Sequence, residues 1–228
     1  MIGYYVILGL FTAVGWYVSN KLKSKFKHYS TLPNTSGMTG YEVGMAMMDH
    51  YNISGVKIVQ GQGSLTDHYN PRTKTVALSP AVYQGRSIAS AAVAAHEVGH
   101  VVQHATAYKF LEMRSSLVPV VQFSSKMQQY LFMGVIFGLG SGIGGSWMIM
   151  ILAATFGATA LFSLITLPVE FDASKRALVW LDETGVTQGQ EYDGAKDALW
   201  WAAMTYVAQA LSALVMFLYF LMMATGRD

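Results

Sequence analysis

The chain has 228 residues, of which 53% are hydrophobic and only 12% are charged. A typical soluble domain carries about 25% charged residues, so the composition argues against an ordinary soluble protein. The net charge is +2, and no basic run is interleaved with aromatic residues; no nucleic-acid partner is expected. The chain contains no cysteine, which excludes disulfide bonds and thiolate metal sites.

The few charges leave three long charge-free segments, at residues 1–20, 128–169 and 198–226. A helix that spans a bilayer needs about 20 predominantly apolar residues. The first and last segments are each long enough for one span, and the middle segment can hold two. The sequence therefore predicts a mainly α-helical, polytopic membrane protein with the lipid bilayer as its main partner.

We expect five segments along the chain. They are an N-terminal transmembrane anchor, a first water-exposed portion, a transmembrane hairpin of two helices, a short connector and a C-terminal transmembrane helix (residues 1–20, 21–115, 116–168, 169–202 and 203–228). The hairpin should begin near Val118, turn in the glycine cluster at 138–145 and end its second span at Pro168. Proline removes a backbone donor and commonly ends a helix.

The basic residues indicate which face each portion occupies. Of the 15 Lys and Arg, ten lie in residues 21–115 and three in residues 168–202. Four lysines, at every second position from Lys21 to Lys27, follow the anchor directly. Cytoplasmic segments carry the excess of Lys and Arg, and two crossings separate the two basic portions. Both are therefore predicted to face the cytoplasm.

The first water-exposed portion combines a small β-sheet with a helix. A strand is expected at 56–59, and a hairpin is expected from two extended runs at 64–69 and 73–78, because Asn70-Pro71-Arg72 between them favours a turn. From Ser87 to about Ala107 the chain is rich in alanine, the best helix former, and no proline interrupts it.

This helix contains His96-Glu97-Val98-Gly99-His100, which matches the pattern H-E-x-x-H. Residues four apart share one helical face, so both histidines can bind one zinc ion. Glu97, beside them, can accept a proton from a water that the metal activates for attack on a peptide carbonyl. Gly99 would let another segment approach the helix closely. The motif predicts a metallopeptidase with Glu97 as base and one zinc ion per chain.

The motif needs a third protein ligand, and we favour Glu170. It is the first charge after a gap of 43 residues that follows Lys126, and it lies where the third span should emerge on the same face as the motif. Asp172 is expected to orient a histidine from outside the coordination shell, although it could be the ligand instead. His104 lies one further turn from His100, so we expect it to pack or to support the site.

These motifs resemble a known family. His96-Glu97-x-x-His100, followed after a membrane hairpin by Leu167-Pro168-Val169-Glu170-Phe171-Asp172-Ala173-Ser174, is similar to the YugP-type neutral zinc metallopeptidases of prokaryotic membranes. The resemblance covers nearly the whole chain, and a more distant one links it to the HtpX and Ste24 peptidases. Those families favour E-x-x-x-D, whose aspartate braces a ligand; here that position is Ser174.

The resemblance implies a gluzincin-like core built on the H-E-x-x-H helix, with His96, His100 and Glu170 as ligands. It also implies that an extended polypeptide substrate pairs with an edge strand beside this helix, which we place at Thr73, Lys74, Thr75, Val76, Ala77 and Leu78. Main-chain hydrogen bonds would then hold the substrate. The pattern does not assign the transition-state donor; a Tyr, His or Arg is expected, and Arg176 is named only as a guess.

The expected function is that of an endopeptidase in a prokaryotic cell (inner) membrane, acting from the cytoplasmic side on membrane or membrane-proximal polypeptides, with homo-oligomers possible. Two other interpretations remain. The segment between Arg86 and Lys109 holds 22 mostly apolar residues, so the active helix could lie inside the bilayer, as in site-2-type proteases. The chain could also be a non-catalytic, zinc-stabilised membrane scaffold, but Glu97 has no purpose at a purely structural zinc site.

Overall fold

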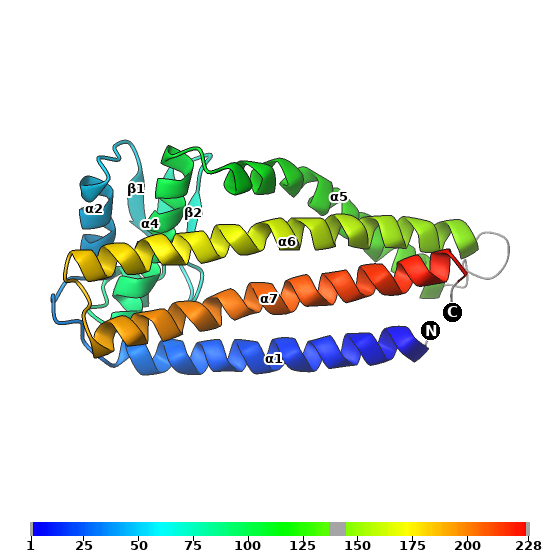
Figure 1. Ribbon diagram of the computed structural model, residues 1–228, viewed down its shortest axis with the longest axis horizontal. Coiled ribbons are helices and arrows are strands. Elements are labelled where there is room, and N and C mark those ends of the chain that lie inside the picture. The colour runs from blue at the N-terminus through cyan, green and yellow to red at the C-terminus, as the bar shows by residue number, and fades with distance from the viewer. Residues whose placement is uncertain (1, 137–144, 227–228) are drawn as a thin grey trace. The chain divides into compact units, whose positions relative to one another are not determined.

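The computed structural model describes residues 2–136 and 145–226 of the chain (Figure 1). In chain order the elements are α1 (Ile2–Ser30), α2 (Gly40–His50), β1 (Lys57–Gln60), β2 (His68–Asn70), β3 (Thr75–Leu78), α3 (Pro80–Tyr83), α4 (Ile88–Ala105), α5 (Lys109–Ile136), α6 (Gly145–Glu183) and α7 (Gln190–Ala224). The protein is thus mainly helical, with a small mixed sheet, as the sequence predicts. The glycine turn expected at 138–145 lies, apart from its last residue, outside the described residues.

The chain forms two compact units. Unit 1 comprises Met1–Tyr17, Glu112–Leu167 and Thr205–Asp228, and unit 2 comprises Val18–Leu111 and Pro168–Met204. Unit 1 is held by apolar side chains of α5, α6 and α7, namely Leu131, Met148, Leu152, Ala153, Met216 and Phe220. Phe156 stacks on Phe220 with ring centroids 5.2 Å apart.

Within the described residues, three helical segments are long and apolar enough to cross a membrane: Ile2–Ser30, Trp147–Glu183 and Gln190–Ala224. The helix expected from Val118 is part of α5 but is not among them, because Lys126, Gln128 and Gln129 make it too polar. Its crossing therefore stays a prediction. The helix α4 is also not among these segments.

The long helices continue past the predicted limits of the membrane spans. The helix α6 runs through Pro168 to Glu183, although the proline was expected to end it. Proline in a helix removes one hydrogen bond, but packing of the residues that follow offsets this loss, since Val169, Ala173 and Ala177 are fully buried. The helical geometry of residues 169–174 therefore comes from tertiary contacts that the local sequence does not reveal.

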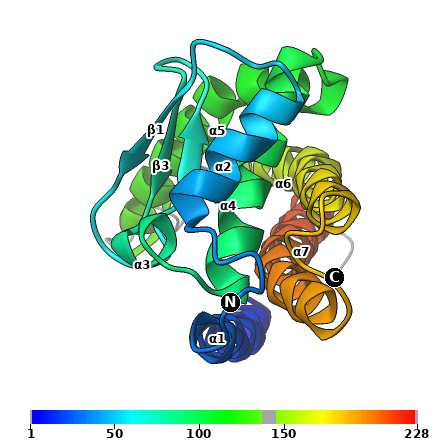
Figure 2. The ribbon, with the colours of Figure 1, turned by 90° about the vertical axis from the view of Figure 1, so that its left-hand side faces the viewer.

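The sheet has the order β1-β3-β2, with β1 parallel and β2 antiparallel to β3. The predicted hairpin is confirmed, since Tyr69 pairs with Val76 across it. The predicted substrate edge at Thr73–Leu78 is wrong, because β3 is the central strand and has neighbours on both sides. The sequence pattern revealed the hairpin but not that β1 would pair with its second strand. Figure 2 shows the strands together with α2 and α4, which pack against them.

Unit 2 is built around α4. Ser87 caps the helix, its side chain accepting a hydrogen bond from the backbone of Ser90, and the capping box of Thr39 and Glu42 starts the neighbouring α2. A side chain at Gly99 would place its Cβ 2.6 Å from the carbonyl oxygen of Ala173. The predicted role of Gly99 is therefore confirmed: the absence of a side chain lets α4 approach the part of α6 that carries Glu170.

Candidate metal centre

The two histidines of the sequence motif lie one turn apart on α4. Their ring centroids are 4.8 Å apart, and the ring planes are nearly perpendicular. The side chains are 13% and 10% exposed for His96 and His100, respectively. Both rings thus point inward from the same helical face, where their Nε2 atoms meet Glu170.

Glu170 completes the group from α6. Its Oε2 atom lies 3.4 Å from His96 Nε2 and 3.6 Å from His100 Nε2, and its side chain is 2% exposed. Among the described residues this is the one group of at least three such side chains whose ligand atoms lie close enough to share an ion, all within 4.8 Å of one another. Two ligands of a tetrahedral zinc, each bound at about 2.0–2.1 Å, lie about 3.3–3.4 Å apart. The three donors therefore fit a zinc ion.

Glu97 lies beside this group on α4 and is 8% exposed. Burial is the main effect that raises the pKa of its carboxyl above the ordinary value, and the charges of Glu170 and Asp67 raise it further. His96 and His100 act in the opposite direction but do not offset the burial. A carboxylate with a raised pKa holds a proton more readily than an exposed one, which suits a group that must accept a proton and pass it on.

His100 is oriented by a side chain that the sequence analysis did not consider. Its Nδ1 lies 3.0 Å from Oε1 of Gln103, which is fully buried. The Nε2 of Gln103 donates to the carbonyl of Val169 and to Asp172, both at 2.8 Å. Because both amide protons are thus engaged, Gln103 presents an acceptor to His100. Nδ1 of His100 must then be the donor, which leaves the lone pair of Nε2 free for a metal.

The electrostatics of His100 follow from the same neighbours. Burial acts to lower the pKa of its imidazole, but the carboxylate of Glu170, with smaller contributions from Glu97 and Gln103, raises it above the ordinary value. A cation at this position takes the place of the proton that the carboxylates favour. The cluster is therefore an electronegative site suited to a divalent ion.

His96 is held from the other helix. Its Nδ1 lies 3.1 Å from Oγ of Ser174, which comes four residues after Glu170. In the more distantly similar HtpX and Ste24 peptidases an aspartate at this position braces a ligand, and here the serine hydroxyl contacts the histidine instead. Each histidine therefore has a hydrogen-bonding partner on its Nδ1 atom, and both leave Nε2 directed at Glu170.

Comparison with known proteins gives the family. The family model described as "Putative neutral zinc metallopeptidase" matches residues 4–225. The chain belongs to this neutral zinc metallopeptidase family. It is also 40% identical over 209 residues to the "Putative membrane protease YugP" of Bacillus subtilis (strain 168), an alignment that covers 91% of each chain. No solved structure shows a significant match.

Membership of the neutral zinc metallopeptidase family agrees with the geometry of the cluster. The family name implies zinc as the metal, and two imidazoles with one carboxylate are donors that zinc accepts. The structure brings together the three predicted ligands His96, His100 and Glu170, with Glu97 beside them. Their roles in metal binding and catalysis stay predictions.

Asp172 takes a more indirect position than predicted. Within the described part of the chain it makes no hydrogen bond or ion pair with a histidine; it accepts hydrogen bonds from Gln103 at 2.8 Å and from Nε of Arg176 at 2.6 Å. Its effect on His100 is therefore transmitted through the amide of Gln103. The guanidinium of Arg176 is engaged by Asp172 and lies 5.8 Å from the ring centroid of Tyr108, which argues against Arg176 as the transition-state donor.

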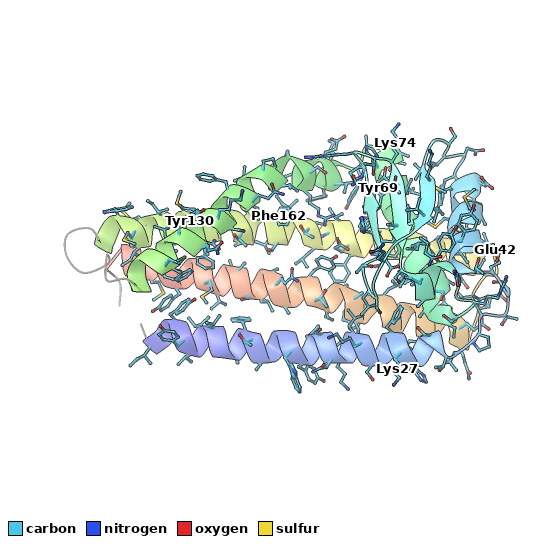
Figure 3. The ribbon with its side chains drawn as sticks, turned by 180° about the vertical axis from the view of Figure 1, so that it is seen from behind. Lys27, Glu42, Tyr69, Lys74, Tyr130 and Phe162 are labelled. Atoms are coloured by element: carbon cyan, nitrogen blue, oxygen red, sulfur yellow. The ribbon has the colours of Figure 1, made fainter. Side chains whose placement is uncertain are left out.

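His104 does not join the metal group. Its Nδ1 is 2.8 Å from the hydroxyl of Tyr69 on β2 (labelled in Figure 3), and the contact links the last turn of α4 to the sheet. A residue four positions after His100 lies one helical turn farther along the same face, so helix geometry explains why His104 lies outside the metal group.

We expect Gln103→Leu to weaken zinc binding by about 10–100-fold, the range typical when a partner of a metal ligand is lost. The substitution keeps the side-chain volume but removes the acceptor for His100 and both donors toward α6. Competition with a chromophoric chelator measures the affinity. The control is Gln84→Leu, because Gln84 is bonded to Gln60 outside the cluster. An unchanged affinity in Gln103→Leu would contradict the role of Gln103.

Proposed function

We propose that this protein is a membrane-embedded zinc endopeptidase. The observation that carries the proposal is the buried convergence of His96, His100 and Glu170 on one point, with Glu97 next to it, in a chain of a zinc metallopeptidase family. His96, His100 and Glu170 would hold the ion. When bound, zinc polarises a carbonyl and lowers the pKa of water to about 7.

The protein's own groups would then handle the proton. Glu97, whose pKa is raised chiefly by burial, accepts a proton from the attacking water and delivers it to the leaving amine. Ser174 and Gln103 hold the histidine rings in place during this exchange. Preorganised ligands avoid a reorganisation cost during the reaction. Hydrolysis then needs no covalent intermediate with the chain.

The substrate would pair with β2 (His68–Asn70) rather than with β3. Within the described part of the chain, β2 has a strand neighbour on one side only, and Tyr69 connects it to α4. An unpaired strand edge can hold an extended polypeptide by main-chain hydrogen bonds, irrespective of sequence. We infer a gluzincin-like arrangement in which the cleaved chain lies between this edge and α4.

The substrate class and the location follow from the charge distribution. Three helical segments are long and apolar enough to cross a membrane, and the basic residues gather in residues 21–115 and 168–202. By the positive-inside rule these residues, and with them the metal centre, face the cytoplasm. We infer that membrane or membrane-proximal polypeptides of a prokaryotic cell are cut there.

Removing the metal tests this function. We expect chelation of the purified protein in detergent to abolish cleavage of an unfolded protein, followed by mass spectrometry, and zinc to restore it. The chelated protein should bind about one zinc per chain again, because the three donors form one group. If the zinc-loaded protein cuts none of a panel of unfolded and membrane polypeptides, the interpretation as a zinc-stabilised scaffold replaces the proposal.

A further inference from the structure

A concave feature of unit 2 lies between α6 and α7, and none of the three predicted zinc ligands lines it. It is a cavity of about 560 Å³ lined by one face of α6, from Phe171 to Val179, and one face of α7, from Tyr192 to Ala203. The lining is largely apolar, and three of its large apolar side chains are 38–54% exposed: Phe171, Val179 and Trp200. Neither the metal group nor the substrate edge uses these side chains.

One aromatic contact fixes the relative register of the two walls. The ring centroids of Phe171 on α6 and Trp200 on α7 are 6.3 Å apart. Lys175 comes four residues after Phe171, and Lys196 comes four residues before Trp200. The chain turns back between α6 and α7 through residues 184–189, so both lysines lie about one helical turn from the aromatic pair on the same side. Both lysines line the cavity.

These two lysines have no carboxylate of their own. Both are exposed, and in the part of the chain that the structure describes neither forms an ion pair. The carboxylate of Asp197 is already engaged, 2.7 Å from Nζ of Lys25 and 2.8 Å from the hydroxyl of Tyr29. Asp193 is the remaining carboxylate of the lining and lies nearly one turn farther from the aromatic pair than Lys196. The aromatic pair thus forms an apolar end of the cavity, and the two lysines place positive charge at its middle.

The aromatic pair also marks a change of charge along both helices. On α6 no residue before Glu170 carries a charge, and on α7 the last charge before the charge-free segment 198–226 is Asp197. Trp and Tyr are enriched where a membrane helix leaves the hydrocarbon, at the level of the headgroups, and Trp200 fits such a position. The apolar end of the cavity thus lies at the predicted membrane boundary, and the lysines lie one turn toward the water.

We propose that this cavity binds an anionic phospholipid, whose phosphate lies between Lys175 and Lys196 and whose acyl chains run along Phe171 and Trp200. The inference rests on the membrane location in the proposed function but not on peptidase activity. Ser174 lines the same cavity, and its Oγ contacts Nδ1 of His96. A bound lipid therefore touches a residue that orients a predicted zinc ligand.

The test is native mass spectrometry of the full-length protein in detergent, titrated with phosphatidylglycerol or phosphatidylcholine. The double variant K175Q/K196Q should bind phosphatidylglycerol about thirtyfold more weakly than wild type, because each lysine near a membrane surface contributes about fivefold to anionic lipid binding. Binding of phosphatidylcholine should change little. The matched control K23Q/K27Q removes two exposed lysines from α1, outside the cavity, and should retain wild-type binding.

Three outcomes would overturn the proposal. Equal losses in the two double variants would show general attraction to a basic surface instead of a site. Full displacement of the lipid by glycerol phosphate would show a soluble phosphate ligand. Unchanged binding in K175Q/K196Q, with an unfolding temperature equal to that of wild type, would show that the cavity holds no lipid phosphate. Because the readout is lipid binding, a protein without peptidase activity can still support the proposal.

Discussion

Glu97→Gln is expected to lower the rate of peptide cleavage by about 10²–10⁴-fold, the range usual for loss of a general base, and to leave bound zinc unchanged. The amide has the size of the carboxylate but cannot accept the proton. Glu97 is not part of the converging group of His96, His100 and Glu170, so its replacement removes no expected ligand. Loss of the Glu97 charge should not destabilise Glu170, because the two carboxylates repel each other and each makes ionisation of the other less favourable.

The measurement compares cleavage of an unfolded protein by mass spectrometry at equal metal content. Glu112→Gln serves as the control, because it makes the same chemical change at an exposed position at the start of α5. Wild-type cleavage by Glu97→Gln would mean that another group takes the proton. Loss of zinc in the variant would mean that Glu97 supports the metal, and the assignment of roles within the cluster would have to change.

The part of this site that the sequence predicts is the part set by helix geometry. The spacing of His96 and His100 places both rings on one face of any helix, and the alanine-rich composition around them makes the helix itself predictable. Gly99 is a further local signal: the motif could accept any residue there, and a glycine indicates that another segment comes near. That segment is the part of α6 around Ala173.

The remaining contacts depend on how separate segments pack. Nothing in the local sequence shows that α6 continues through Pro168, so the positions of Asp172 and Ser174 relative to the histidines could not be derived from spacing. On a continuous helix, Ser174 lies one turn beyond Glu170 and reaches His96, whereas Asp172 reaches Gln103. Gln103 gave one overlooked signal: it is a polar residue, three positions after His100, in a helix that is rich in alanine and valine.

The sheet illustrates the same limit. Turn residues between two extended runs predict a hairpin, and that prediction depends on neighbours in sequence. Which strand lies at an edge depends on a third strand, β1, whose parallel pairing with β3 is non-local. The strand with an unpaired edge next to α4 is therefore β2, so we assign substrate pairing to β2 instead of β3.

Glu170→Gln should weaken zinc binding by more than the 10–100-fold typical of residues outside the coordination shell, because it replaces the only anionic member of the predicted ligand set. The carboxylate of Glu170 lies within 3.6 Å of both Nε2 atoms and is 2% exposed. Glutamine has nearly the same shape, so the packing of α6 against α4 should survive. The same change at the exposed Glu183, near the end of α6, should leave the affinity unchanged.

Comparison with Asp172→Asn separates the two candidates for the third ligand. Asp172 holds Gln103 and Arg176, so its neutralisation should cost about 10–100-fold in zinc affinity, as for an outer partner. The order of effects is the decisive quantity: Glu170→Gln must weaken binding more than Asp172→Asn. If chelator competition gives the reverse order, Asp172 is the ligand, and α6 must change its position relative to α4 when the metal binds.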